Sequence, residues 1–186
     1  LSGSGIQGRS PVAEIQEILV TEKAIQETVR ELAARISSDY AGKDPVLISI
    51  LKGAFIFTAD LMRHIRLPVL LDFVHASSYG KGTESSREIR IKKDIETDIA
   101  GRHVLLVDCI IDTGETMDFL VKRYAARGPA SLRSVVLLDK RERRLVDVPL
   151  AYVGQVIPDR FVVGYGVDCA EQYRNLAYIA AIRTGP

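Results

Sequence analysis

A strand-to-helix transition at residues 104–126 constrains the fold of this chain more than any other feature. The run "VLLV" (104–107) is continuously apolar, which is typical of a strand buried on both faces of a parallel sheet. It leads into the segment "DCIIDTGET" (108–116) and then into a helical pattern that ends before Gly128 and Pro129. A strand, a turn and a helix in this order form the repeating unit of α/β proteins. We therefore expect a mainly parallel, twisted sheet flanked by helices.

The same alternation recurs along most of the chain. Apolar residues at helical spacing, with Thr21 as an N-cap, predict the first helix. The predicted helices span residues 21–40, 54–65 and 116–126. The predicted strands span residues 46–51, 68–79, 87–95, 100–108, 134–140, 151–158 and 161–166. The polar segment 80–86 between two of these strands is expected to be a mobile loop.

Length and composition restrict the class of protein. The chain has 186 residues, which suits one domain over residues 11–186. We interpret the small, polar segment 1–10 as an expression remnant or a disordered tail. The net charge of +1 does not favour nucleic acid or a membrane as a partner, and no apolar run approaches the ~18 residues that span a bilayer. Two cysteines without CxxC spacing indicate neither a disulfide scaffold nor structural zinc, so we expect a cytoplasmic protein.

Polar residues that follow the predicted strands mark the candidate site, because ligands of α/β sheets bind at the carboxyl ends of strands. The segment "DTGET" (112–116) could form an anion cradle, since Gly114 permits a tight turn and a helix N-terminus presents free N–H groups. Thr113 and Thr116 add hydroxyl groups, whereas the Glu115 side chain should point away from an anion. Taken alone, the segment could equally be an ordinary capped helix start.

Four segments in order carry a resemblance to a known family. "VLLVDCIIDTGETM" (104–117) resembles the ribose-5-phosphate signature of the type I phosphoribosyltransferases. "ILKGAFIFTADL" (50–61), "SSYG" (77–80) and "IPDRFVVGYGVDCAEQYRNL" (157–176) resemble the hypoxanthine-guanine phosphoribosyltransferases. The resemblance implies the type I fold, with a small hood subdomain built from the chain ends. It also implies purine salvage, in which phosphoribosyl pyrophosphate and hypoxanthine or guanine give IMP or GMP.

The resemblance implies a role for each matching residue. Asp112 is the implied catalytic acid/base residue near the purine N7. The ribose and 5-phosphate would be bound by Asp108, Cys109, Asp112, Thr113, Gly114, Glu115 and Thr116. Pyrophosphate would be bound by Lys52, Gly53 and Arg174, with a peptide before Lys52 that is often cis in the family. The mobile loop would carry Ser78 and Tyr79, the purine would contact Lys140, Phe161, Val162 and Asp168, and Mg²⁺ would be held by Asp108 and Asp168.

Cys109 departs from the family pattern, which has two adjacent acids at this point of the chain. A carboxylate there would accept hydrogen bonds from the ribose hydroxyls, whereas a thiol is a poor acceptor. We expect Cys109 to lie at the ribose and to have a raised pKa beside Asp108 and Asp112. The departure keeps two alternatives open, a catalytically weakened nucleotide-binding relative and a regulatory RNA-binding homologue. The family also implies a homo-oligomer, a dimer or a tetramer.

Overall fold

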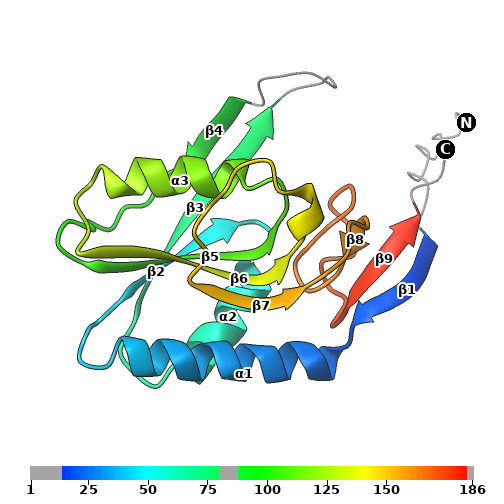
Figure 1. The fold of residues 1–186 in the computed structure, drawn as a ribbon, viewed down its shortest axis with the longest axis horizontal. Helices are drawn as coiled ribbons and strands as arrows, with labels where there is room; N and C mark the ends of the chain where they lie inside the picture. The colour runs from blue at the N-terminus through cyan, green and yellow to red at the C-terminus, as the bar shows by residue number, and fades with distance from the viewer. Residues whose placement is uncertain (1–13, 80–87, 184–186) are drawn as a thin grey trace, which may run out of the picture.

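A six-stranded twisted sheet forms the centre of the computed structural model, which describes residues 14–79 and 88–183 (Figure 1). Its strands are β2 (Val46–Leu51), β3 (Leu70–Tyr79), β4 (Glu88–Lys93), β5 (His103–Ile111), β6 (Ser131–Asp139) and β7 (Tyr152–Val156). The strand order is β4-β3-β2-β5-β6-β7, and every pairing is parallel except that of β3 with β4. The predicted α/β fold with a mainly parallel sheet is confirmed.

Helices cover both faces of this sheet. The helices α1 (Glu22–Asp39) and α2 (Phe55–His64) lie on one face, and α3 (Glu115–Ala125) lies on the other (Figure 1). The predicted N-cap is confirmed, because Thr21 Oγ1 accepts a hydrogen bond from the backbone N–H of Ala24 at 3.2 Å. Alternate residues of β5 pack into the two resulting cores: Leu105 and Val107 face α1 and α2, while Val104 and Leu106 face α3. The sheet is therefore buried on both sides, as its apolar strands predicted.

A second, three-stranded sheet joins the two ends of the described chain. Its strands are β1 (Glu14–Val20), β9 (Ile179–Arg183) and β8 (Val162–Val163), paired antiparallel in the order β1-β9-β8. It matches the hood subdomain that the family resemblance implied. The sequence analysis did not predict β1 or β9, because β1 exposes most of its side chains and carries no clear alternation.

Most predicted strands differ from the observed ones by a few residues at their ends, and two of the differences affect the site. The strand predicted to end at Asp108 continues to Ile111, because its ladder with β6 extends to the pair Ile111↔Asp139. Cys109 therefore lies within β5 rather than in a loop. The strand predicted over 161–166 is reduced to β8, because Gly164, Tyr165 and Gly166 all have positive φ angles. The loop predicted at 80–86 lies outside the described residues.

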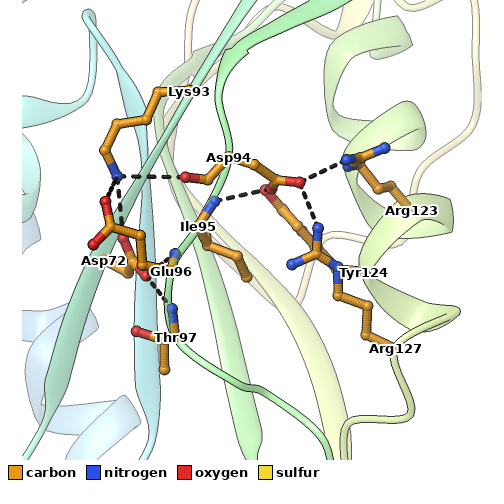
Figure 2. Close-up of polar contacts among 9 residues, drawn as sticks. All are labelled: Asp72, Lys93, Asp94, Ile95, Glu96, Thr97, Arg123, Tyr124 and Arg127. Carbon is orange, nitrogen blue, oxygen red and sulfur yellow. Dashed lines mark hydrogen bonds and ion pairs between the residues drawn. The ribbon is translucent and has the colours of Figure 1, made fainter.

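Two carboxylates fix the connection between β4 and β5 (Figure 2). Asp72, on β3, accepts hydrogen bonds from the backbone N–H groups of Phe73, Glu96 and Thr97. Asp94 accepts hydrogen bonds from the Ile95 backbone and from the side chains of Arg123, Tyr124 and Arg127 on and just after α3. Burial raises the pKa of Asp94, but these hydrogen bonds outweigh it and lower the pKa to about 2. Asp94 therefore ties the connection to α3 as a carboxylate.

Candidate active site

The candidate site lies where the connections of the sheet diverge. β2 leads through α2 to β3 on one side, whereas β5 leads through α3 to β6 on the other. The adjacent carboxyl ends of β2 and β5 thus form a topological switch point, where α/β proteins bind ligands. The turns that follow these strands contain Lys52 and Asp112, and Lys140 follows β6 at the same edge. The structure therefore brings these three sequence-predicted residues to one edge of the sheet.

The predicted anion cradle forms the start of α3. Gly114 occupies the N-cap position with a φ of 90° and has no side chain that could cap the helix, while the Glu115 N–H donates a hydrogen bond to Thr113 Oγ1 at 3.4 Å. A Cβ atom at Gly114 would lie 2.6 Å from the carbonyl oxygen of Val146, so this position requires glycine. Thr113 Oγ1 donates a hydrogen bond to Glu115 Oε2 at 2.9 Å. The backbone N–H groups of a first helical turn and the helix dipole together suit a phosphate.

The Asp112 carboxylate lies between two cations beside this cradle. Lys140 Nζ is 3.8 Å from Asp112 Oδ2, and Arg143 Nε is 3.2 Å from Oδ1. The Asp112 side chain is 42% exposed, although its Oδ1 atom is buried and accepts no hydrogen bond from the described residues. Lys140 is only 5% exposed, so it is not a solvated surface lysine although it lies in a run of charged residues. A carboxylate at a partly open position can accept or donate a proton, and the buried ammonium beside it supplies a hydrogen-bond donor.

A second cluster gathers the residues predicted for pyrophosphate. Lys52 Nζ lies 2.9 Å from Glu171 Oε2, and Arg174 Nη2 lies 3.1 Å from the same oxygen and 2.8 Å from Asp168 Oδ1. Hydrogen bonds from Lys52 and then Arg174 lower the pKa of Glu171. The peptide bond between Leu51 and Lys52 is cis, as the family resemblance implied. Glu171 was not singled out from the sequence, yet it bridges the two predicted anion-binding cations.

Close backbone packing brings the two halves of this cluster together. A Cβ atom at Gly166, whose φ is 97°, would lie 2.2 Å from the carbonyl oxygen of Gly53. Arg174 Nη1 also donates a hydrogen bond to the carbonyl oxygen of Gly166 at 2.8 Å. The turn after β2 and the loop after β8 therefore touch through glycine backbone, which places Lys52 and Arg174 on the same side of the site.

The residues predicted to contact the purine differ in exposure. Phe161 is 52% exposed, so its ring face is available for stacking, whereas Val162 is 3% exposed and lies in β8. The carbonyl oxygen of Phe161 accepts a hydrogen bond from the backbone N–H of Ile182 at 2.9 Å, which anchors this segment to β9. The side chains of Ser78 and Tyr79, predicted for the mobile loop, lie outside the described residues.

Cys109 is a core residue in this structure. Its side chain is fully buried among the residues that face α1 and α2, and its thiol donates to the carbonyl oxygen of Tyr165 at 3.6 Å. This placement contradicts the expectation that the thiol lies open to the ribose. Burial, and then the Asp108 carboxylate, raise the pKa of Cys109, so the predicted direction holds but burial is its main cause.

Asp108 points to the other face of β5 and has a perturbed carboxylate. Burial raises its pKa to about 7, against hydrogen bonds from the backbone N–H groups of Cys109 and Ile110 that lower it. Within residues 14–79 and 88–183, no three His, Cys, Asp or Glu side chains are grouped as a metal site. Mg²⁺ often takes only one or two protein carboxylates together with water and substrate phosphates. Asp108 and Asp168 fit that pattern as separate oxygen donors.

A parallel sheet with a glycine turn at its switch point and an acid beside it is the arrangement expected of a phosphoribosyltransferase, and the chain belongs to that class. In agreement, the phosphoribosyl transferase domain family matches residues 16–170 of this chain.

Similarity to curated proteins and solved structures identifies the branch of that family to which the chain belongs. The hypoxanthine-guanine phosphoribosyltransferase of Bacillus subtilis (strain 168) is 44% identical over 170 residues, which cover 91% of this chain and 94% of that protein. The enzyme of the same name from Streptococcus pneumoniae (strain ATCC BAA-255 / R6) is 46% identical with the same coverage. A crystal structure of a hypoxanthine-guanine phosphoribosyltransferase from Bacillus anthracis is 48% identical, with a TM-score of 0.87 over 91% of this chain and 100% of that one. The chain belongs to the hypoxanthine-guanine phosphoribosyltransferases, and its activity is the phosphoribosyl transfer of purine salvage.

Proposed function

We propose that this chain transfers the 5-phosphoribosyl group from phosphoribosyl pyrophosphate to hypoxanthine or guanine, which releases pyrophosphate and gives IMP or GMP. The observation that carries the proposal is the placement of Asp112, Lys140 and the glycine turn at the start of α3 at one edge of the sheet. The reaction needs an acid that handles the purine proton, a cation that binds a purine carbonyl, and a group of N–H donors that binds the 5-phosphate.

Anchoring the 5-phosphate positions the sugar for reaction. The backbone N–H groups at Gly114–Thr116 would bind the phosphate, and this remote binding energy would hold the anomeric carbon in place. The bond from this carbon to pyrophosphate then breaks as the bond to a purine nitrogen forms, through an oxocarbenium-like state.

Recognition of the purine would depend on Lys140 and Phe161. The Lys140 ammonium can only donate hydrogen bonds, so it suits the 6-oxo group of hypoxanthine or guanine and disfavours the 6-amino group of adenine. The exposed ring of Phe161 would stack on the base. Asp112 would hold the proton at the purine N7 as charge develops on the base.

The leaving pyrophosphate would be bound by Lys52 and Arg174. Both cations already hold a carboxylate oxygen of Glu171, which supports their use as an anion site. Mg²⁺ bound at Asp108 or Asp168 would supply charge neutralisation for the leaving group. Pyrophosphate would take the place of the Glu171 carboxylate on the two cations.

Steady-state rates with hypoxanthine, guanine, xanthine and adenine, each with and without Mg²⁺, test this proposal. We expect turnover with hypoxanthine and guanine, little with adenine, and loss of turnover without Mg²⁺. Turnover with adenine equal to that with hypoxanthine would refute the proposed role of Lys140. An RNA mobility shift at two salt concentrations would detect the alternative RNA-binding function, which no described residue favours.

We also propose a cytoplasmic homo-oligomer. The support for self-association is the family resemblance, which implies a dimer or a tetramer. No helix in the described part of the chain is long and apolar enough to cross a membrane. Light scattering after size-exclusion chromatography would measure the assembly, and a monomer at micromolar concentration would refute it.

A further inference from the structure

Asp139, at the end of β6, is a buried carboxylate that the proposed reaction does not use. The residue is 2% exposed, and its two oxygens accept hydrogen bonds from two arginines that follow it in the chain. Arg141 Nε donates to Oδ2 at 3.1 Å from a side chain that is 68% exposed. Arg144 Nη2 donates to Oδ1 from a side chain that is 17% exposed. The two arginines share one carboxylate but differ in burial.

Of these two arginines, only the less exposed Arg144 also contacts the turn that precedes α3. Arg144 Nε donates a hydrogen bond to the carbonyl oxygen of Asp112 at 3.2 Å. The guanidinium thus joins a fixed, buried carboxylate to the main chain of the proposed acid/base residue. A planar guanidinium can hold two acceptors in fixed directions, which a lysine ammonium on a flexible stem cannot reproduce.

The residues next to Arg144 hold the same loop from behind. The backbone N–H groups of Leu145 and Val146 both donate to the carbonyl oxygen of Thr113, at 2.9 and 3.0 Å. The Arg144 stem also fills the space under Gly114, where a Cβ atom would lie 2.9 Å from Arg144 Cδ. The turn that presents N–H groups to a phosphate is therefore packed on segment 144–146.

We propose that Arg144, oriented by Asp139, is a positioning residue that sets the main chain of the 112–114 turn, and so places Asp112 and the phosphate cradle for phosphoribosyl transfer. The inference rests on the proposed roles of Asp112 and the cradle. Arg144 touches neither reacting atom, so it acts through the turn that it holds. Asp139 also precedes Lys140, so one buried carboxylate links the purine end of the site to the sugar-phosphate end.

The variant Arg144→Lys distinguishes a positioning role of Arg144 in catalysis from a contribution of Arg144 to the stability of the fold. The lysine ammonium retains a charge partner for Asp139, so the urea midpoint should stay near that of the unchanged protein. It cannot also hold the Asp112 carbonyl, so the turn should shift. Misplacement of a catalytic group by about 1 Å can cost roughly 100-fold, and we expect kcat with phosphoribosyl pyrophosphate and hypoxanthine to fall by about 10- to 100-fold. The KM for hypoxanthine should change by less than about threefold.

Arg141→Met is the matched control, because it removes the other guanidinium from the same carboxylate without touching the turn. Its kcat should stay within about twofold of that of the unchanged protein. Arg144→Met should lower kcat at least as far as Arg144→Lys, and if it does not fold, the lysine variant decides the question. Unchanged kinetics in Arg144→Lys, or a loss that matches its unfolded fraction, would overturn the inference.

Asp112→Asn separates this inference from the proposed roles of the site. If Asp112→Asn slows turnover while Arg144→Lys does not, the positioning role of Arg144 fails and the role of Asp112 stands. If Asp112→Asn leaves turnover unchanged, the proposed role of Asp112 fails first and the inference about Arg144 fails with it.

Discussion

Replacing Asp94 with asparagine tests how much the polar cluster of Figure 2 stabilises the fold. The partners of Asp94 lower its pKa from 3.8 to about 2, and each pKa unit corresponds to about 1.36 kcal/mol. The resulting value of roughly 2.4 kcal/mol is an upper estimate, because Arg123 and Arg127 are 40% and 34% exposed and solvent screens such pairs. We expect Asp94→Asn to lower the free energy of unfolding by about 1–2 kcal/mol. For a chain of this length, that corresponds to a decrease in Tm of roughly 2–8 °C.

The dependence of this effect on pH identifies its cause. The pKa of Asp94 is lower in the folded chain than in the unfolded chain, so its charge stabilises the fold above pH ~4. That contribution falls as the pH decreases from about 4 to about 2. The difference in stability between the unchanged protein and Asp94→Asn should therefore be full at pH 7 and shrink steadily below pH 4.

Urea unfolding followed by far-UV circular dichroism at pH 7, 5, 4 and 3 measures this difference, and it suits a chain without tryptophan. Asp118→Asn is the matched control on α3, the helix that carries partners of Asp94, because within the described residues Asp118 forms an ion pair only with the exposed Lys122 at i,i+4 spacing. Such a pair contributes about 0.3–0.5 kcal/mol. A loss in Asp94→Asn that is equal at pH 7 and pH 3, or no larger than that of the control, would refute the argument from charge.

Three further predictions concern the site. Cys109 should react with iodoacetamide only after unfolding, because it is fully buried and its pKa is raised, whereas the half-buried Cys169 should react in the folded protein. Peptide mass mapping identifies the modified cysteine, and modification of Cys109 before Cys169 would contradict this prediction. Asp112→Asn should lower kcat by about 10²–10⁴-fold with a smaller change in the KM for phosphoribosyl pyrophosphate, and steady-state kinetics that show only a KM effect would remove Asp112 from the acid/base role. Lys140→Met should lower kcat/KM for hypoxanthine by about 10- to 150-fold, because a charged hydrogen bond contributes about 1.5–3 kcal/mol. If only the kcat/KM for phosphoribosyl pyrophosphate fell, Lys140 would lie at the other end of the site.

Features with a local cause could be predicted from the sequence. Thr21 caps α1 because its side chain meets an N–H three residues away, and the apolar run at 46–51 forms a strand because both of its faces are buried. The start of α3 could be predicted from the glycine that its turn requires at position 114. Each of these features depends on residues that are neighbours in the chain.

Features with a distant cause could not be predicted. β1 forms because residues 14–20 pair with residues 179–183, and no local period records that pairing. Cys109 is buried because β5 continues past Asp108 along β6. The sequence predicted that the strand ends at Asp108, because a charged residue after an apolar run is typical of a strand end. The run 139–144 contains a buried acid and a buried lysine among exposed arginines, and a row of charges in the sequence does not show which of its members face inward.

The strand order of the small sheet has a consequence for the timing of assembly on the ribosome. In the described part of the chain, β8 pairs only with β9, and the Phe161 carbonyl is held by the N–H of Ile182. All six strands of the large sheet precede β8 in the chain, so they can pair before residues 179–183 are synthesised. A nascent chain that ends near residue 178 would therefore contain the sugar-phosphate end of the site and Lys140, but its Phe161 segment would lack the strand that holds it. The proposed stacking side of the purine site is thus completed only when β9 has been synthesised.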